Sequence, residues 1–196
     1  LHSNQLSGSI PPEIGALTQL TDLTLLENRL EGTIPSELGN LTQLQTLVIR
    51  GNKLRGPIPP SLARLSSLVP SPGDTDLSFN ALYASDEALI TFLNSKDPDW
   101  AATQTIAPTE VTATSLDNAI VLVSWLPVTF SAGAGHYNVM ISDTPGGPYA
   151  LAGQTTNKTT SSVQVTGLTP GTRYYSVVQT HTDINANNPS ALDSEY

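Results

Sequence analysis

The 196-residue sequence contains no cysteine, one methionine and only eight lysine and arginine residues against 17 aspartate and glutamate residues. The absence of cysteine excludes disulfides, thiolate nucleophiles and cysteine-ligated metal centres. The acidic excess argues against nucleic acid or an anionic membrane surface as the main partner. The longest aliphatic run, residues 119–123, is too short for a membrane-spanning helix, so direct membrane insertion of this segment is not expected. A binding or structural protein is favoured.

The composition changes midway along the chain. Leucine is concentrated in residues 1–100 and threonine in residues 101–196, which predicts two cores of different geometry. A Pro- and Asp-containing segment ending at Trp100, followed by a polar stretch, marks the junction. We therefore expect a first domain over residues 1–100, a linker over residues 101–107 and a second domain over residues 108–196.

The first domain contains an internal repeat with a spacing of 24 residues. More than ten positions keep this register, which excludes a chance match. Among them are Asn4, Asn28 and Asn52; Leu6, Leu30 and Leu54; Gly8, Gly32 and Gly56; and Pro11, Pro35 and Pro59. A fourth copy, which includes Asn80, follows after a spacing of 28, and its four extra residues fit a loop at residues 69–73.

The leucine spacing predicts a strand in each repeat. Side chains at positions i and i+2 point the same way only on a strand, so Leu23 and Leu25 should face inward. One coil is too small to bury its apolar side alone, and stacking merges the leucines into a continuous core. The repeated Asn28, Asn52 and Asn80 are expected to turn inward and satisfy backbone groups.

These features resemble a known family. The unit Leu23-x-Leu25-x-x-Asn28-x-Leu30-x-Gly32-x-Ile34-Pro35 resembles the leucine-rich repeat in its plant-type, 24-residue form. The resemblance implies an α/β-type solenoid, a strand-lined segment of a horseshoe. Because Leu1 corresponds to Leu25, the chain is expected to begin inside a repeat, as a piece of a longer protein.

A helix is expected to cap the last coil. Ser85-Asp86-Glu87 predicts its start, with an N-cap residue and an acidic first turn. Asn94 is the expected stop, and Trp100 is expected to seal the end of the core.

The second domain has short alternating apolar runs between turn residues, which is typical of an all-β sandwich. Trp125 ends one such run, and Leu168-x-Pro170-x-Thr172-x-Tyr174 lies between two others. These residues resemble a fibronectin type III domain. The resemblance implies that Trp125 is the core tryptophan and Tyr174 the tyrosine of the corner turn. The last strand, after Pro189, is expected to be short or truncated.

Side chains that alternate with the inward leucines should face the concave surface of the solenoid. They form a candidate ligand-binding face of Asp22, Thr24, Leu26, Thr46, Val48, Arg50, Asp76 and Ser78, which Asp74 and His2 extend. Leu26 and Val48 would be its apolar centre. The alternative is a solvated sheet surface whose partner binds elsewhere.

No catalytic, metal or cofactor site is expected. The histidines His2, His136 and His181 lie far apart in sequence and lack metal-ligand spacing. The segments that begin at Asp74 and Asp183 start like calcium loops but lack the glycine and glutamate at the sixth and twelfth positions. On the sandwich, the outward-facing apolar residues Met140, Tyr175 and Val177 are a candidate interface patch.

The two modules together are similar to those of extracellular recognition or adhesion proteins. The cysteine-free cap is similar to secreted or cell-surface proteins of bacteria. The resemblance implies a non-enzymatic module that binds a protein or glycan through the repeats, with the sandwich as spacer. Two alternatives stay open: an accessory segment of a larger secreted enzyme, and a filament or surface-layer subunit that self-associates through its open ends. Asn40 and Asn157 match the glycosylation acceptor pattern, which matters only in a host that glycosylates secreted proteins.

Overall fold

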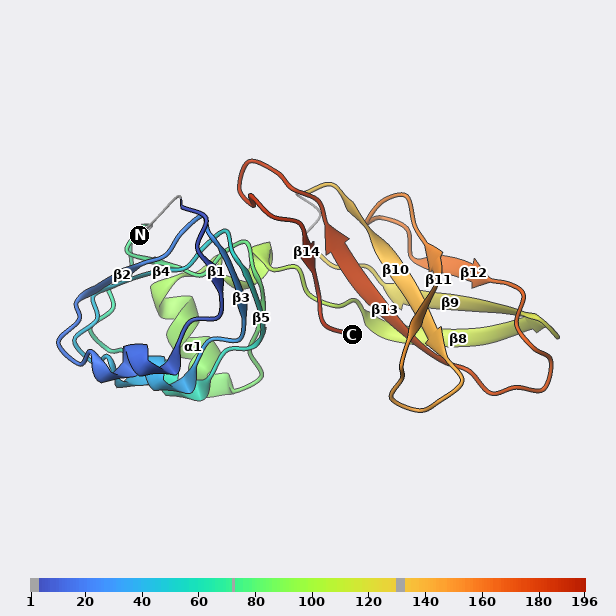
Figure 1. The fold of residues 1–196 in the computed structure, drawn as a ribbon, viewed down its shortest axis with the longest axis horizontal. Coiled ribbons are helices and arrows are strands. Elements are labelled where there is room, and N and C mark those ends of the chain that lie inside the picture. Colours follow the sequence, from blue (N-terminus) through green and yellow to red (C-terminus); the bar gives the residue numbers. More distant parts are fainter. Residues whose placement is uncertain (1–3, 72, 130–132) are drawn as a thin grey trace. The chain divides into compact units, whose positions relative to one another are not determined.

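The computed structural model describes residues 4–71, 73–129 and 133–196 (Figure 1). The chain divides into two compact units. The first comprises the residues up to 105 together with residues 184–192, and the second comprises residues 106–183 together with residues 193–196. A repeat solenoid and an all-β sandwich are present, as the sequence predicts.

Two parallel sheets and a column of 3-10 helices form the coils of the solenoid (Figure 1). The first sheet has the order β2-β4-β6, with β2 at Asp22–Thr24, β4 at Thr46–Val48 and β6 at Thr75–Asp76. The second has the order β1-β3-β5-β7, with β1 at Ser7–Gly8, β3 at Arg29–Gly32, β5 at Lys53–Pro57 and β7 at Ala81–Tyr83. The 3-10 helices are η1 (Pro12–Ala16), η2 (Ser36–Asn40) and η3 (Pro60–Arg64).

The leucines of the coils form a continuous core. Leu23, Leu25, Leu47 and Ile49 are all buried in one cluster that runs from Ile10 to Trp100. Each coil begins its 3-10 helix after an Ile-Pro pair, whose proline fixes an extended backbone before the turn. The core is therefore built from equivalent positions of successive coils, as stacking of incomplete units requires.

Asparagine side chains join each coil to the one before it. The Asn52 Nδ2 group donates to the carbonyl oxygens of Ile49 at 2.9 Å and Leu25 at 3.0 Å. Its Oδ1 atom accepts a hydrogen bond from the Leu30 N–H at 3.1 Å. Asn28 and Asn80 make equivalent contacts, and all three residues are fully buried. We refer to these residues as the asparagine ladder.

The 3-10 helices pack with almost no space between them. A Cβ atom added to Gly15 would lie 2.4 Å from the carbonyl oxygen of Glu37, and one added to Gly39 would lie 2.4 Å from that of Ser61. The equivalent residue of η3 is Ala63. On the side away from η2, η3 packs against the capping helix α1 and not against another 3-10 helix. Glycine therefore allows the close approach of η1 to η2 and of η2 to η3.

The capping helix α1 spans Glu87–Lys96, and the Asp86 side chain accepts a hydrogen bond from the Leu89 N–H at 2.8 Å. The predicted stop at Asn94 is wrong, because the helix continues to Lys96 and ends before Pro98, which cannot extend it. The Asn94 Oδ1 atom instead accepts a hydrogen bond from the Trp100 indole N–H at 3.0 Å.

Residues 101–105, which the sequence assigns to a linker, belong to the solenoid. Ala101–Thr103 form the 3-10 helix η4, and the next two residues are buried. The Gln104 side chain donates to the carbonyl oxygens of Leu77 and Trp100 at 3.0 and 2.7 Å and accepts from the Leu82 N–H at 3.0 Å. It thus closes the asparagine ladder. The linker prediction is wrong for these residues because the polar side chains of Gln104 and Thr105 are buried.

The sandwich consists of two antiparallel sheets. One has the order β12-β9-β8, with β8 at Thr109–Asp117, β9 at Ile120–Leu126 and β12 at Ser162–Val165. The other has the order β11-β10-β13-β14, with β10 at Gly135–Ser142, β11 at Ala150–Gln154, β13 at Tyr175–Thr182 and β14 at Leu192–Asp193. The last strand, β14, has only two residues.

Aromatic side chains organise the sandwich core. Trp125 and Tyr137 are buried and meet edge to face, with ring centroids 5.1 Å apart. The Tyr137 hydroxyl accepts a hydrogen bond from the Val128 N–H at 2.9 Å. The Tyr174 hydroxyl accepts one from the Thr169 N–H at 3.2 Å, which is the geometry of a tyrosine corner.

Candidate ligand-binding groove

The strands of the first sheet align the candidate face in columns. Asp22 pairs with Thr46, Thr24 with Val48, and Val48 with Asp76. Leu26, Arg50 and Ser78 lie two residues beyond these strand positions. Because neighbouring parallel strands are about 4.8 Å apart, side chains of one column lie close enough to touch the same ligand.

The candidate residues differ in exposure. Asp22 is exposed, and Thr24, Leu26, Thr46, Arg50 and Asp76 are partly buried. Val48 and Ser78 are buried, with exposed fractions of 3% and 7%, so the expectation of an open surface fails at these two positions. His2 lies outside the described residues.

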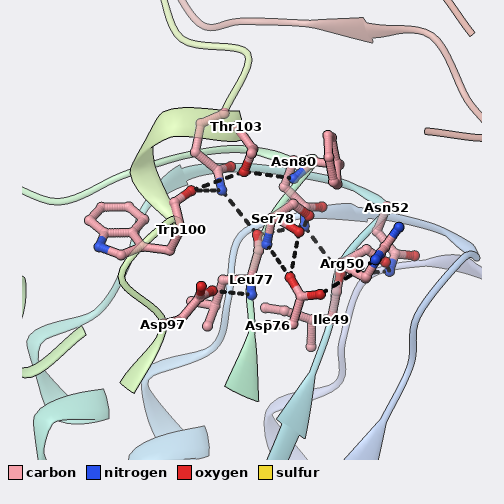
Figure 2. Close-up of polar contacts among 12 residues, drawn as sticks. Ile49, Arg50, Asn52, Asp76, Leu77, Ser78, Asn80, Asp97, Trp100 and Thr103 are labelled. Carbon is pink, nitrogen blue, oxygen red and sulfur yellow. Dashed lines mark hydrogen bonds and ion pairs between the residues drawn. The ribbon is translucent and has the colours of Figure 1, made fainter. Parts of the chain in front are cut away.

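A polar cluster occupies the middle of this face (Figure 2). The Arg50 guanidinium lies 3.7 Å from Asp76 Oδ2, and the Ser78 hydroxyl makes a short hydrogen bond to Asp76 Oδ1. The Ser78 N–H also donates to Asp76 Oδ1, at 3.0 Å. Arg50 Nε is buried and lacks a hydrogen-bond acceptor among the described residues. The guanidinium therefore has donor capacity that the protein does not use.

The face forms one side of a groove of about 810 Å³. Leu26, Val48, Arg50, Asp76 and Ser78 line one side, and Asp22, Thr24 and Thr46 are outside it. The end of α1 and the segment that follows it supply further lining residues, namely Lys96, Asp97, Pro98, Asp99 and Thr103. The groove is therefore made by the last coils together with the cap, a contribution that the sequence analysis missed.

Phe79 lies in the groove in an unusual backbone conformation. Its φ angle is 54°, in the left-handed region, and Glu27 and Gly51 adopt φ angles of 53° and 65° at the equivalent position before each ladder asparagine. Glycine suits this conformation, whereas a bulky residue is strained there by roughly 1–3 kcal/mol. The Phe79 ring centroid lies 5.4 Å from the Arg50 guanidinium carbon, within cation–π range.

Asp97 lines the groove and accepts a hydrogen bond from the backbone of the core residue Leu77. Burial raises the pKa of its carboxyl above the ordinary value, although the hydrogen bond from the Leu77 N–H opposes this shift. That bond is 2.9 Å long and reaches Asp97 Oδ2 (Figure 2). Nearby Asp76 and Asp99 raise the pKa further by charge repulsion. This wall of the groove is therefore acidic.

The two segments that begin like calcium loops have different structures from each other. Thr75–Asp76 are in strand β6, and the Asp76 carboxylate is engaged by Arg50 and Ser78. In the second segment, Asn185 Oδ1 accepts hydrogen bonds from the N–H groups of the two residues at 187 and 188. The asparagine thus stabilises a turn.

The sandwich brings two of the histidines together. His136 and His181 are directly opposite each other on β10 and β13, although 45 positions separate them in sequence. The pairing of the two strands thus joins residues that are far apart in sequence. Met140 lies opposite Val177 on the same strands, and both are partly buried, as is Tyr175.

Family comparisons match both units. The fibronectin type III model matches residues 106–192, and the leucine-rich repeat model matches residues 19–41 and 43–65. The chain contains leucine-rich repeats and a fibronectin type III domain. Modules of these two types are typically non-catalytic binding or scaffold units. No helix among the described residues has both the length and the apolar character to span a membrane.

Solved structures resemble parts of the chain. The plant peptide hormone receptor RGFR1 in complex with RGF2 is 39% identical over 48% of this chain and 15% of that chain, with a TM-score of 0.43. The BIR3–SERK2 complex from Arabidopsis thaliana is 35% identical over 49% and 50%, with a TM-score of 0.40. The chicken CNTN1 FN1-FN3 domains are 22% identical over 46% and 30%, with a TM-score of 0.36. This chain thus spans half or less of each of these proteins. No curated protein matches it significantly.

Proposed function

We propose that this chain is an extracellular recognition module whose groove binds a peptide segment of a partner protein, with the sandwich as spacer. The observation that carries the proposal is the 810 Å³ groove itself, which combines an apolar floor with unused polar capacity. Leu26 and Val48 supply the floor, and the partly exposed Arg50 guanidinium supplies hydrogen-bond donors. Concave pockets with a few such polar groups are the usual form of binding sites.

The charge of the groove suggests the chemistry of the ligand. Glu27, Asp76, Asp97 and Asp99 line it, against only Arg50 and Lys96. A net negative lining attracts cations and rejects acidic segments. We therefore favour a peptide with an apolar side chain next to a lysine or arginine, whose backbone carbonyl accepts a hydrogen bond from Arg50.

Phe79 supports this assignment. At this left-handed position the preceding coil has Gly51, whereas Phe79 and Glu27, the two residues that are strained there, both line the groove. Strain of this kind is concentrated at functional sites.

The cysteine-free cap favours a secreted or surface protein of bacteria.

A peptide array tests the proposal. The intact chain is applied to peptides that vary one apolar and one flanking charged position, and hits are measured by fluorescence anisotropy. We expect basic hits whose affinity falls with salt, and at least a tenfold loss in Leu26→Arg and in Phe79→Gly. Leu17→Arg is the control, because Leu17 is exposed and lies outside the groove lining. Equal binding by Leu26→Arg and Leu17→Arg would show that the peptide binds elsewhere.

A further inference from the structure

The outer face of the β10–β13 pair carries a compact cluster of nitrogen and oxygen ligands. His136 and His181 occupy opposite positions on the two strands, and their rings stack with centroids 4.5 Å apart and planes at 22°. Both rings point away from the core, because the adjacent Tyr137 and Thr180 are buried inside the sandwich. The two imidazoles therefore lie side by side on the sheet.

Two carboxylates flank the His181 ring. Asp183 Oδ1 lies 3.3 Å from Nε2, and Asp193 Oδ1 lies 2.7 Å from Nδ1. One ligand atom from each of His136, His181 and Asp183 lies within 4.8 Å of the others. The side chains of His181 and Asp183 are 21% and 49% exposed, so solvent ions can reach them.

We propose that His136, His181 and Asp183 form a binding site for a divalent transition cation, with Zn²⁺ as the preferred ion. Two imidazole nitrogens and one carboxylate oxygen are a donor set that suits zinc. Asp193 is not a ligand in this site. Its contact with Nδ1 orients the His181 ring and leaves Nε2 for the metal, as carboxylates commonly do behind metal-bound histidines.

The distances fit this assignment after small side-chain movements. Ligands about 2.0–2.1 Å from a tetrahedral zinc ion lie about 3.4 Å from one another. The pair formed by His181 Nε2 and Asp183 Oδ1 already has this spacing, at 3.3 Å. The ligand atom of His136 lies within 4.8 Å of this pair, so a small movement of its ring brings it to the same spacing. A water molecule or an external ligand completes the fourth position.

The same donor set disfavours calcium and magnesium, which prefer several oxygen ligands. One positive side chain opposes metal binding. The Lys158 ammonium interacts electrostatically with Asp183 and donates a 2.7 Å hydrogen bond to the neighbouring Thr182 hydroxyl. Removal of this charge by Lys158→Met should therefore tighten metal binding severalfold, which ordinary loss of structure would not do.

The proposal concerns the sandwich and is independent of the groove in the solenoid. Its test uses the intact, tag-free chain, titrated with Zn²⁺ against a chromogenic chelator and with Co²⁺ for its visible absorption spectrum. We expect one ion per chain and no competition from millimolar Ca²⁺. His136→Thr, His181→Thr and Asp183→Asn should each weaken Zn²⁺ affinity at least tenfold. Asp193→Asn should weaken it about tenfold, through ring orientation.

His2→Gln is the matched control, since His2 is the one histidine of the sequence that is not among the proposed ligands. Its Zn²⁺ affinity should equal that of the wild type. In NMR spectra, zinc should shift the ring signals of His136 and His181 and leave those of His2 in place. Far-UV circular dichroism without metal verifies that each variant is folded; threonine suits strand positions, and Asp183→Asn keeps the side-chain shape. A dissociation constant weaker than about 1 mM, or equal affinity in the wild type and the His181→Thr and Asp183→Asn variants, would overturn the site.

Discussion

Gln104 lies 24 residues after Asn80 and repeats its role with a longer side chain. Asn80 accepts from the Leu54 N–H at 3.1 Å, and Gln104 accepts from the Leu82 N–H at 3.0 Å. Both side chains also donate to the Leu77 carbonyl oxygen. Gln104 thus provides the acceptor for the last coil, where no further asparagine follows Asn80 in the ladder.

Loss of the Gln104 side chain should weaken the solenoid. Gln104→Ala leaves the buried Leu82 N–H without a partner and removes one of the two hydrogen bonds to the Leu77 carbonyl oxygen, which we expect to lower the free energy of unfolding by roughly 1–3 kcal/mol. Urea unfolding followed by the fluorescence of Trp100, in a Trp125→Phe background, measures the change. Gln45→Ala, at an exposed position, should stay within about 0.5 kcal/mol of its parent. Equal effects of the two substitutions would contradict the role of Gln104.

A methyl group between the 3-10 helices should be poorly tolerated. Gly39→Ala places Cβ 2.4 Å from the backbone oxygen of Ser61, and backbone cannot move aside as a flexible side chain can. We expect a loss of about 1–3 kcal/mol in the free energy of unfolding. The reverse substitution at the equivalent position of the next coil, Ala63→Gly, should cost at most about 1 kcal/mol. If both cost the same, the helices have more freedom to separate than the structure indicates.

Phe79 should be unfavourable for stability. Phe79→Gly relieves the left-handed strain but removes the contact with Arg50. We therefore expect the free energy of unfolding to stay constant or to rise by no more than about 1 kcal/mol. Phe79→Ala keeps the strain and loses the ring, and it should be less stable than Phe79→Gly. Calorimetry on the three proteins checks this order. A glycine variant less stable than the alanine variant would show that the ring packs more strongly than the strain costs.

The sandwich should gain stability between pH 8 and pH 10. Burial lowers the pKa of Lys158 from its ordinary value of 10.5 to about 8. Above pH 8 the folded state loses this proton while the unfolded state keeps it, so the free energy of unfolding rises with pH. We expect a rise of about 1–2 kcal/mol relative to Lys158→Met, which lacks the group. Denaturant unfolding followed by Trp125, in a Trp100→Phe background, measures the difference.

The pH range of this stability comparison has an upper limit, set by Tyr137. Burial raises the pKa of the Tyr137 hydroxyl, so its ionisation in the unfolded state lowers stability above pH 10. Measurements should therefore stop at that pH. Parallel curves for the wild type and Lys158→Met would contradict a buried ammonium with a lowered pKa.

Periodic features of the fold could be predicted from the sequence. The 24-residue spacing predicts the coils because every repeat presents the same side chains to its neighbours. Alternation predicts the strands, and the registry of Thr24, Val48 and Asp76 in one column follows from both. Gln104 keeps the same spacing, and a search that allowed glutamine in place of asparagine would have found it.

Features that depend on side-chain volume or on distant pairing could not be predicted. The burial of Val48 and the second wall of the groove depend on how the capping segment returns to the last coils. The meeting of His136 and His181 depends on the register between β10 and β13, since a slip by one residue would place one ring on the opposite face. The sequence alone does not specify that register.

The asparagine ladder has a direction. Each Oδ1 or Oε1 atom accepts an N–H from the preceding coil, so Leu6 is held by Asn28, Leu30 by Asn52, Leu54 by Asn80 and Leu82 by Gln104. Every coil thus depends on residues made later by the ribosome. During synthesis each of these leucine N–H groups therefore emerges 22 to 26 residues before the side chain that satisfies it.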